Sequence, residues 1–110
     1  MQREAVRFCT EGGVLHAAVL CELDHYTARA VRQRIDRELF AGRPRILVLD
    51  FSAVRFMDSS GIALILGRAE AAEAVGAVVK LQGLSDALMK LVRLSGLERV
   101  KNLTVTPSGR

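Results

Sequence analysis

The segment Phe56-Met57-Asp58-Ser59-Ser60-Gly61 holds the residues of this 110-residue chain whose types and spacing are best suited to chemistry. It lies between a predicted buried strand and a predicted helix, which is where open α/β sheets place their sites. Serine is favoured at the N-cap, so Ser59 and Ser60 are candidate caps, and Asp58 adds a negative charge beside the positive helix end. On local preference alone, the segment is a helix cap and nothing more.

The same hydroxyl is also suited to reversible modification. Backbone N–H groups and the dipole at a helix N-terminus favour a bound phosphate. Phosphorylation of Ser59 would add about −1.5 to −2 charges and three acceptor oxygens without breaking the helix. The fold would stay intact while its outward surface changes, which is how an interaction surface is switched.

A nucleophilic serine is the competing use of this hydroxyl, and the sequence argues against it. The two histidines are His16, in the middle of a predicted strand, and His25, which we expect at the surface. The segment lacks the first glycine of a nucleophile elbow, and no acid is placed to orient a histidine. No Gly-rich phosphate loop follows the first strand. The sequence therefore predicts no catalytic residue, no cofactor and no enzymatic activity.

The positive net charge of the chain is weak evidence for nucleic-acid binding. Sixteen Lys and Arg against twelve Asp and Glu give a formal net charge of +4. The basic residues are interleaved with acids, and we expect Arg32 to pair with Asp36 and Arg34 with Glu38 along a solvated helix face. With no Trp, one Tyr and four Phe, few rings are available for base stacking, so direct nucleic-acid binding is disfavoured.

Cys9 and Cys21 are the two cysteines, and no metal-ligand spacing connects them. We expect two free thiols, buried or half-buried as small apolar side chains, and no metal site. No apolar stretch reaches the about 20 residues that cross a bilayer. Arg3, Glu4 and Arg7 interrupt the start of the chain before the apolar run of a signal peptide can form. A cytoplasmic protein without a membrane segment is the expectation.

Alternating strands and helices must position the serine segment. Strands are predicted over 4–10, 14–20, 45–51, 77–81 and 100–105, and helices over 27–41, 60–75 and from Ser85 to about Gly96. The glycine pair at 12–13 predicts a tight hairpin between the first two strands. The order β-β-α-β-α-β-α-β predicts an α/β fold with a mixed, mostly parallel sheet and an N-terminal hairpin. We expect a single domain over 1–110, ordered over about 4–105, with a frayed tail at 106–110.

Apolar spacing predicts which surfaces of these elements are buried. The inward-facing helix residues are expected to be Val31, Ile35 and Leu39 in the first helix, Ile62, Ile65, Leu66, Ala69 and Ala72 in the second, and Leu88, Leu91 and Val92 in the third. The unbroken apolar run at 46–49 is typical of a central strand that is covered on both faces.

Two longer stretches resemble the signature sequences of a known family. They are residues 22–28, Glu-Leu-Asp-His-Tyr-Thr-Ala, and residues 56–68, which begin Phe-Met-Asp-Ser-Ser-Gly. Both are similar to the anti-sigma factor antagonists, which are single STAS domains, and most similar to the anti-sigma-F type of spore-forming bacteria. The Leu-Ser-Gly-Leu segment at 94–97 also resembles this family. The order of strands and helices matches from about Val6 to Val105, nearly the whole chain.

The resemblance implies a partner-switching role in the control of a sigma factor. The unphosphorylated protein would bind an anti-sigma factor that is also a serine kinase, and the sigma factor would be released. The kinase would phosphorylate the serine directly after the aspartate, here Ser59, using its own bound ATP, and the two proteins would separate. A serine phosphatase would reset the cycle.

Five further residues are expected at the partner contact: Glu22, Asp24, Asp58, Ser60 and Gly61. An acidic patch made by these aspartates would suit a basic residue of the kinase, and a phosphate added there would weaken the contact by crowding like charges. Structural roles stay open for the acids. Glu22 can be a solvated loop carboxylate, Asp24 a helix cap and Asp58 a turn former.

The chain departs from the family pattern in three ways. Cys21 occupies the position where the family has a glycine before the Glu-Leu-Asp stretch, and its side chain alters the turn that presents Asp24. Relatives continue into a final helix, so we expect one sheet face to be less covered here. The positive net charge is unusual beside an acidic contact patch, so the basic residues must lie mainly elsewhere.

Two other functions remain open from the sequence. One is the antagonist of the general-stress sigma-B system, although Asp24-His25 and Leu66-Gly67-Arg68 favour the sporulation type. The other is a STAS subunit of a transporter or lipid-trafficking complex, in which the serine is not switched.

Overall fold

The computed structural model describes residues 4–107, and its elements follow the expected order. The strands are β1 (Val6–Glu11), β2 (Val14–Val19), β3 (Ile46–Asp50), β4 (Val78–Leu84) and β5 (Leu103–Pro107). The helices are α1 (His25–Gly42), α2 (Ser59–Ala74), α3 (Asp86–Ser95) and the short 3-10 helix η1 (Leu97–Arg99). The predicted α/β fold class is confirmed.

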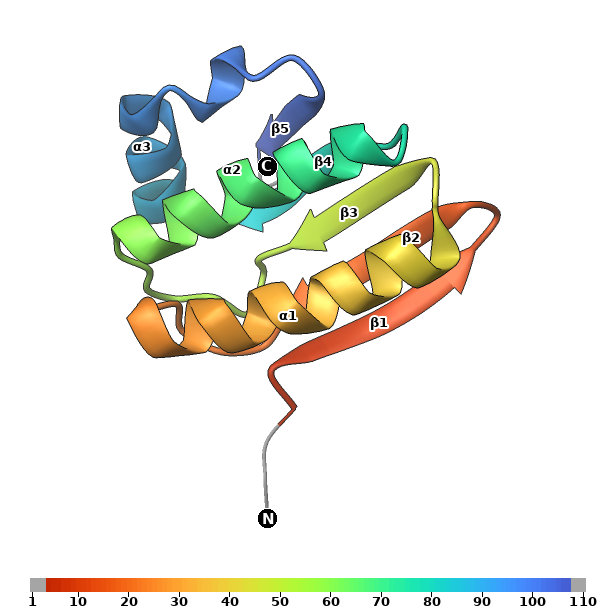
Figure 1. The fold of residues 1–110 in the computed structure, drawn as a ribbon. Helices are drawn as coiled ribbons and strands as arrows, with labels where there is room; N and C mark the ends of the chain where they lie inside the picture. The colour runs from red at the N-terminus through yellow and green to blue at the C-terminus, as the bar shows by residue number, and fades with distance from the viewer. Residues whose placement is uncertain (1–3, 108–110) are drawn as a thin grey trace.

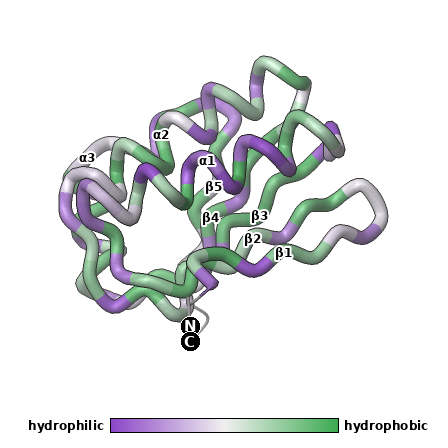
Figure 2. The backbone as a smooth tube through the Cα atoms, turned by 60° about the horizontal axis from the view of Figure 1, so that its bottom comes forward, coloured by the Kyte–Doolittle hydropathy of each residue, from purple (hydrophilic) through white to green (hydrophobic). Residues whose placement is uncertain are grey.

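The sheet has the strand order β1-β2-β3-β4-β5, with β1 antiparallel to β2 and the other pairs parallel. Gly12 and Gly13 form the predicted hairpin turn with φ of 60° and 79°. Each long helix connects two neighbouring parallel strands, and right-handed crossovers then place α1, α2 and α3 on the same face of the sheet, as Figure 1 and Figure 2 show. Within residues 4–107 the opposite face carries no helix.

The hydrophobic core lies between the helices and one face of the sheet. Alternate strand residues such as Leu15, Leu47 and Leu81 point into it and are at most 2% exposed. The prediction that β3 is covered by elements on both faces is wrong. Val48 points to the open face and is still only 5% exposed, because His16 and Lys80 lie directly beside it in the neighbouring strands.

Several predicted boundaries and inward faces need correction. In α2, Leu64 is buried and Leu66 is 39% exposed, so the predicted inward position of Leu66 is wrong. Leu91 of α3 is half-buried. Helix α1 includes Gly42, its last residue, and the C-cap is Arg43, which itself adopts a left-handed φ of 44°. Strand β5 extends to residue 107, two residues into the segment expected to fray, and residues 108–110 lie outside the described part.

Two expectations about single side chains are also wrong. Cys9 points to the open face of the sheet and is exposed, although Cys21 is half-buried as expected. Asp36 pairs with Arg68 of α2 and not with Arg32, and no pair between Arg34 and Glu38 forms among the described residues. No helix in residues 4–107 combines the length and the apolar character that a membrane span requires.

Candidate functional site

The two signature stretches meet at one end of the molecule, where β2 and β3 give way to α1 and α2. Leu23 and Met57 form an isolated parallel bridge between the two loops. The Leu23 N–H donates to the Phe56 carbonyl at 3.1 Å, and the Asp58 N–H donates to the Leu23 carbonyl at 3.2 Å. Asp24 and Asp58 are the next residues after the bridge in the two loops, so the bridge brings their backbones side by side. The backbones of the two acids that are predicted from the sequence to form an acidic patch are therefore adjacent.

Asp24 is the N-cap of α1. One of its carboxylate oxygens accepts hydrogen bonds from the Tyr26 and Thr27 N–H groups, each at 2.9 Å. The Thr27 hydroxyl accepts in return from the Asp24 N–H at 2.9 Å, which completes a capping box. The backbone hydrogen bond from Thr27 is the largest cause that lowers the pKa of Asp24 below its ordinary value. The carboxylate is thus held ionised and exposed at the molecular surface.

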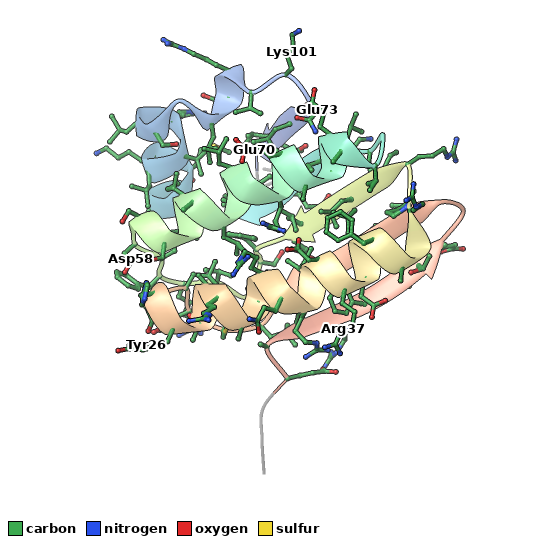
Figure 3. All side chains as sticks on the ribbon, in the orientation of Figure 1. Tyr26, Arg37, Asp58, Glu70, Glu73 and Lys101 are labelled. Atoms are coloured by element: carbon green, nitrogen blue, oxygen red, sulfur yellow. The ribbon has the colours of Figure 1, made fainter. Side chains whose placement is uncertain are left out.

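Asp58 is the N-cap of α2, and it corrects the prediction that a serine caps this helix. Its carboxylate accepts from the Ser60 N–H at 2.7 Å. Ser59 is consequently the first helical residue, and its side chain is exposed, whereas Ser60 is half-buried. Figure 3 shows Asp58 at the start of α2 and Tyr26 at the start of α1, at the same end of the helix pair. A modification of the Ser59 hydroxyl would therefore leave the helix cap in place.

The capped helix end is less open to a phosphate than the sequence suggests. The Asp58 carboxylate already accepts the Ser60 N–H, and the Asp58 carbonyl accepts the Gly61 N–H at 2.9 Å. A phosphate on Ser59 would stand beside the Asp58 carboxylate instead of replacing it. The like charges would make the modified surface strongly negative, while the helix dipole partly offsets the repulsion.

Gly61, which is expected from the sequence at the partner contact, is buried in the first turn of α2. A Cβ at this position would lie 2.6 Å from the Met57 sulfur and 2.8 Å from the Met57 Cβ. Met57 is 4% exposed and packs under the first turn of α2. The glycine therefore lets the loop pass close beneath the helix, and this fixes how Ser59 is presented.

Tyr26 and Phe56 are exposed apolar residues that the sequence interpretation missed. Tyr26 is 82% exposed and Phe56 is 54% exposed, one beside each capping aspartate. Exposed aromatic side chains of this kind are typical anchors of protein interfaces. Their place inside the two signature stretches, in a chain with only five aromatic residues other than histidine, was the available signal.

A pocket of about 520 Å³ lies on the other side of Asp24. Cys21, Glu22 and Arg55 are among the residues that line it. Burial raises the pKa of the Cys21 thiol, and the nearby Asp24 and Glu22 carboxylates raise it further. The thiol therefore stays protonated near neutral pH and is a poor nucleophile. Within residues 4–107 no group of three potential metal ligands comes together.

Comparison with known proteins identifies the family. The STAS domain model matches residues 10–108. The chain is 36% identical over 76 residues to the anti-sigma F factor antagonist of Lysinibacillus sphaericus, a match that covers 69% of this chain and 65% of that protein. It is 32% identical over 88 residues to the same type of protein from Paenibacillus polymyxa, covering 80% and 75%. This chain belongs to the STAS family of anti-sigma factor antagonists.

Solved structures agree with this family. The anti-sigma factor antagonist SpoIIAA in its unphosphorylated form has a TM-score of 0.78 and 27% identity, covering 96% of this STAS domain and 90% of that chain. The phosphorylated form of the Bacillus cell fate determinant SpoIIAA has a TM-score of 0.71 at the same identity, covering 96% and 93%. A more distant relative is the anti-sigma-B factor antagonist of Listeria monocytogenes, 30% identical over 80 residues, covering 72% of this chain and 68% of that protein.

Proposed function

We propose that this protein is a phosphorylation-switched anti-sigma factor antagonist of the sigma-F type, acting in the cytoplasm. In the unphosphorylated state it binds an anti-sigma factor with serine kinase activity, and the sigma factor is released. The observation that carries the proposal is the exposed Ser59 hydroxyl at the first position of α2, directly after its own cap, Asp58. In this proposal the protein is a regulatory binding protein and catalyses no reaction itself.

The surface around Ser59 supports a contact with a basic partner. Asp58 directly precedes the serine, Asp24 caps the neighbouring helix across the Leu23–Met57 bridge, and the exposed Tyr26 and Phe56 add apolar area within the same two loops. A lysine or arginine of the kinase would pair with these carboxylates while the aromatic rings are desolvated. Glu22 is exposed two residues before Asp24 and extends the acidic side of this surface.

Phosphorylation would weaken this contact by charge. A phosphoserine adds about −1.5 to −2 charges and would stand beside two carboxylates that the partner must desolvate. Like charges at a desolvated interface cost several kcal/mol in unfavourable cases, about a hundredfold or more in affinity. The helix itself keeps its cap, since Asp58 and not Ser59 supplies it.

The sigma-B antagonists are the second candidate, because the Listeria relative reaches a similar identity. The higher identity to the two sigma-F antagonists favours the sporulation type. Incubation with each type of kinase separates the two candidates.

The test is intact-mass analysis after incubation with a sporulation-type anti-sigma kinase and ATP, followed by mapping of the modified peptide. We expect one added phosphate on Ser59. Ser60→Ala is the matched control and should still be modified, while Ser59→Ala should fold, bind the kinase and remain unmodified. Ser59→Asp should fold and bind weakly.

Three results would contradict the proposal in different ways. Modification only by a general-stress kinase would assign the protein to the sigma-B system. No modification by either active kinase would favour an unswitched STAS subunit of a larger complex. Unfolding of both Ser59 variants would make the serine a structural residue.

The proposal also includes a serine phosphatase, which would remove the phosphate from Ser59 and so complete the cycle.

A further inference from the structure

A groove of about 360 Å³ lies between the N-terminal halves of α1 and α2. Its lining includes Ala28 and Leu64, which are 8% and 4% exposed, and Ala63. These apolar side chains form a floor between the two helices. The small alanines leave room above it, so the groove can accept side chains from another molecule.

The charged side chains that line this groove are both basic. They are Arg29 and Arg32 of α1, and each is exposed. Neither arginine forms an ion pair with any residue in 4–107. Asp36 lies one helical turn beyond Arg32, but it is engaged by Arg68. The positive charge of Arg32 is close enough to help lower the pKa of buried Arg68 to about 10, after burial itself.

The groove is continuous with the Ser59 surface. Ser60 lines the groove and also donates its N–H to the Asp58 cap. His25 lines the same end and directly follows the Asp24 cap of α1. A partner that covers Ser59 therefore meets two carboxylates at the helix ends and, beside them, two unpaired arginines along α1. Opposite charges side by side fix the orientation in which a partner docks.

We propose that the α1–α2 groove is a second docking element, which binds an acidic segment of the anti-sigma factor while the region around Asp24 and Asp58 binds a basic one. The segment would carry carboxylates toward Arg29 and Arg32 and small apolar side chains toward Ala28, Ala63 and Leu64. This inference rests on the proposed function and adds to it the chemistry of the partner. The inference also assigns a binding role to Arg29 and Arg32 of α1, which lie beside the acidic surface around Asp24 and Asp58.

The test compares two double variants of the full chain in binding to the anti-sigma kinase. Arg29→Gln with Arg32→Gln removes the groove charges without adding an acid beside Asp36. Arg37→Gln with Lys101→Gln is the matched control, because it removes the same charge at exposed positions away from the groove (Figure 3). Association rates are measured at low and at physiological ionic strength, with circular dichroism to verify folding.

We expect the groove variant to associate about tenfold more slowly at low salt and to lose the part of the salt dependence that Arg29 and Arg32 supply, while the control changes less than about twofold. If the two double variants slow association equally, the effect comes from the net charge of the protein and not from the groove, and the inference is overturned. If the groove variant binds and is phosphorylated on Ser59 like the wild type, the groove is not a docking element but the proposed function stands.

Two further outcomes would also overturn the inference. If the wild-type protein neither binds nor is phosphorylated by an active kinase, the proposed function fails together with the groove. If sedimentation shows a dimer of the free protein that the groove variant dissolves, with kinase binding unchanged, the occupant is a second copy of the chain.

Discussion

Arg68 and Asp36 form an ion pair between α2 and α1, and their unequal burial gives a sharp prediction. The Arg68 side chain is 7% exposed, whereas the Asp36 side chain is 24% exposed. Removal of one partner from a buried pair costs about 3–5 kcal/mol, because the other charge is left buried and uncompensated. Asp36→Leu leaves the more deeply buried charge, so we expect a loss of about 3 kcal/mol in the free energy of unfolding.

Arg68→Met leaves the Asp36 carboxylate, which can contact water. We therefore expect a smaller loss, about 1 kcal/mol. The double variant Asp36→Leu with Arg68→Met replaces the pair by apolar side chains, and this is often neutral. The double-mutant cycle should then give a coupling energy of about 4 kcal/mol between the two side chains, the sum of the two single losses.

Urea denaturation followed by circular dichroism measures all four proteins. For a domain of this size, about 3 kcal/mol corresponds to a drop of about 12 °C in melting temperature. Additive single-variant effects would refute the reasoning, because the two side chains would then not be coupled. So would an Arg68→Met loss larger than that of Asp36→Leu, because the exposed fraction would not determine which charge is costly.

Three further predictions test the packing and the charges of the site. Gly61→Ala should destabilise the protein by about 1–3 kcal/mol in urea denaturation, because the new Cβ meets the Met57 Cβ at 2.8 Å; a stability equal to that of the wild type would show that the loop yields freely. Asp24→Asn should make the free energy of unfolding depend less steeply on pH in the acid range. The pKa of Asp24 is lowered in the folded state, so its ionised form adds stability at neutral pH that is lost as the pH falls below about 3.8, its ordinary value, through the folded pKa. The urea midpoints of the wild type and of Asp24→Asn, measured between pH 2 and 7, test this prediction. The same loss of stability in acid for both proteins would contradict it. Iodoacetamide should label exposed Cys9 before half-buried Cys21 in timed mass spectrometry, and the reverse order would contradict the assigned burial.

The fold could be predicted from the sequence where one local signal decided each element. The glycine pair at 12–13, the helical spacing of Val31, Ile35 and Leu39, and the apolar run of β3 all gave the right element types. The error on β3 has a physical reason. An apolar run reports that side chains are shielded, but not whether a helix or the neighbouring strands shield them.

The cap of α2 could not be decided from propensity, because aspartate and serine are both strong N-caps and three of them stand in a row at 58–60. Tertiary structure decides it. The Asp58 N–H donates to the Leu23 carbonyl, which holds Asp58 in the extended conformation of an N-cap and starts the helix at Ser59. Likewise, spacing alone predicted that Asp36 pairs with Arg32, whereas a partner on another helix engages it.

These contacts make the site a rigid platform on which charge, and not backbone shape, can change. Asp24 and Asp58 each cap a helix, the Leu23–Met57 bridge joins the two loops, and Gly61 sits against Met57. A phosphate on Ser59 meets a helix end whose Asp58, Ser60 and Gly61 N–H groups already have acceptors and which is packed from below by Met57, so it need not rearrange the loop. We therefore expect the Ser59→Asp variant to keep the wild-type amide chemical shifts except within a few residues of position 59. Shift changes that spread through α1 would show instead that the modification is transmitted across the helix pair.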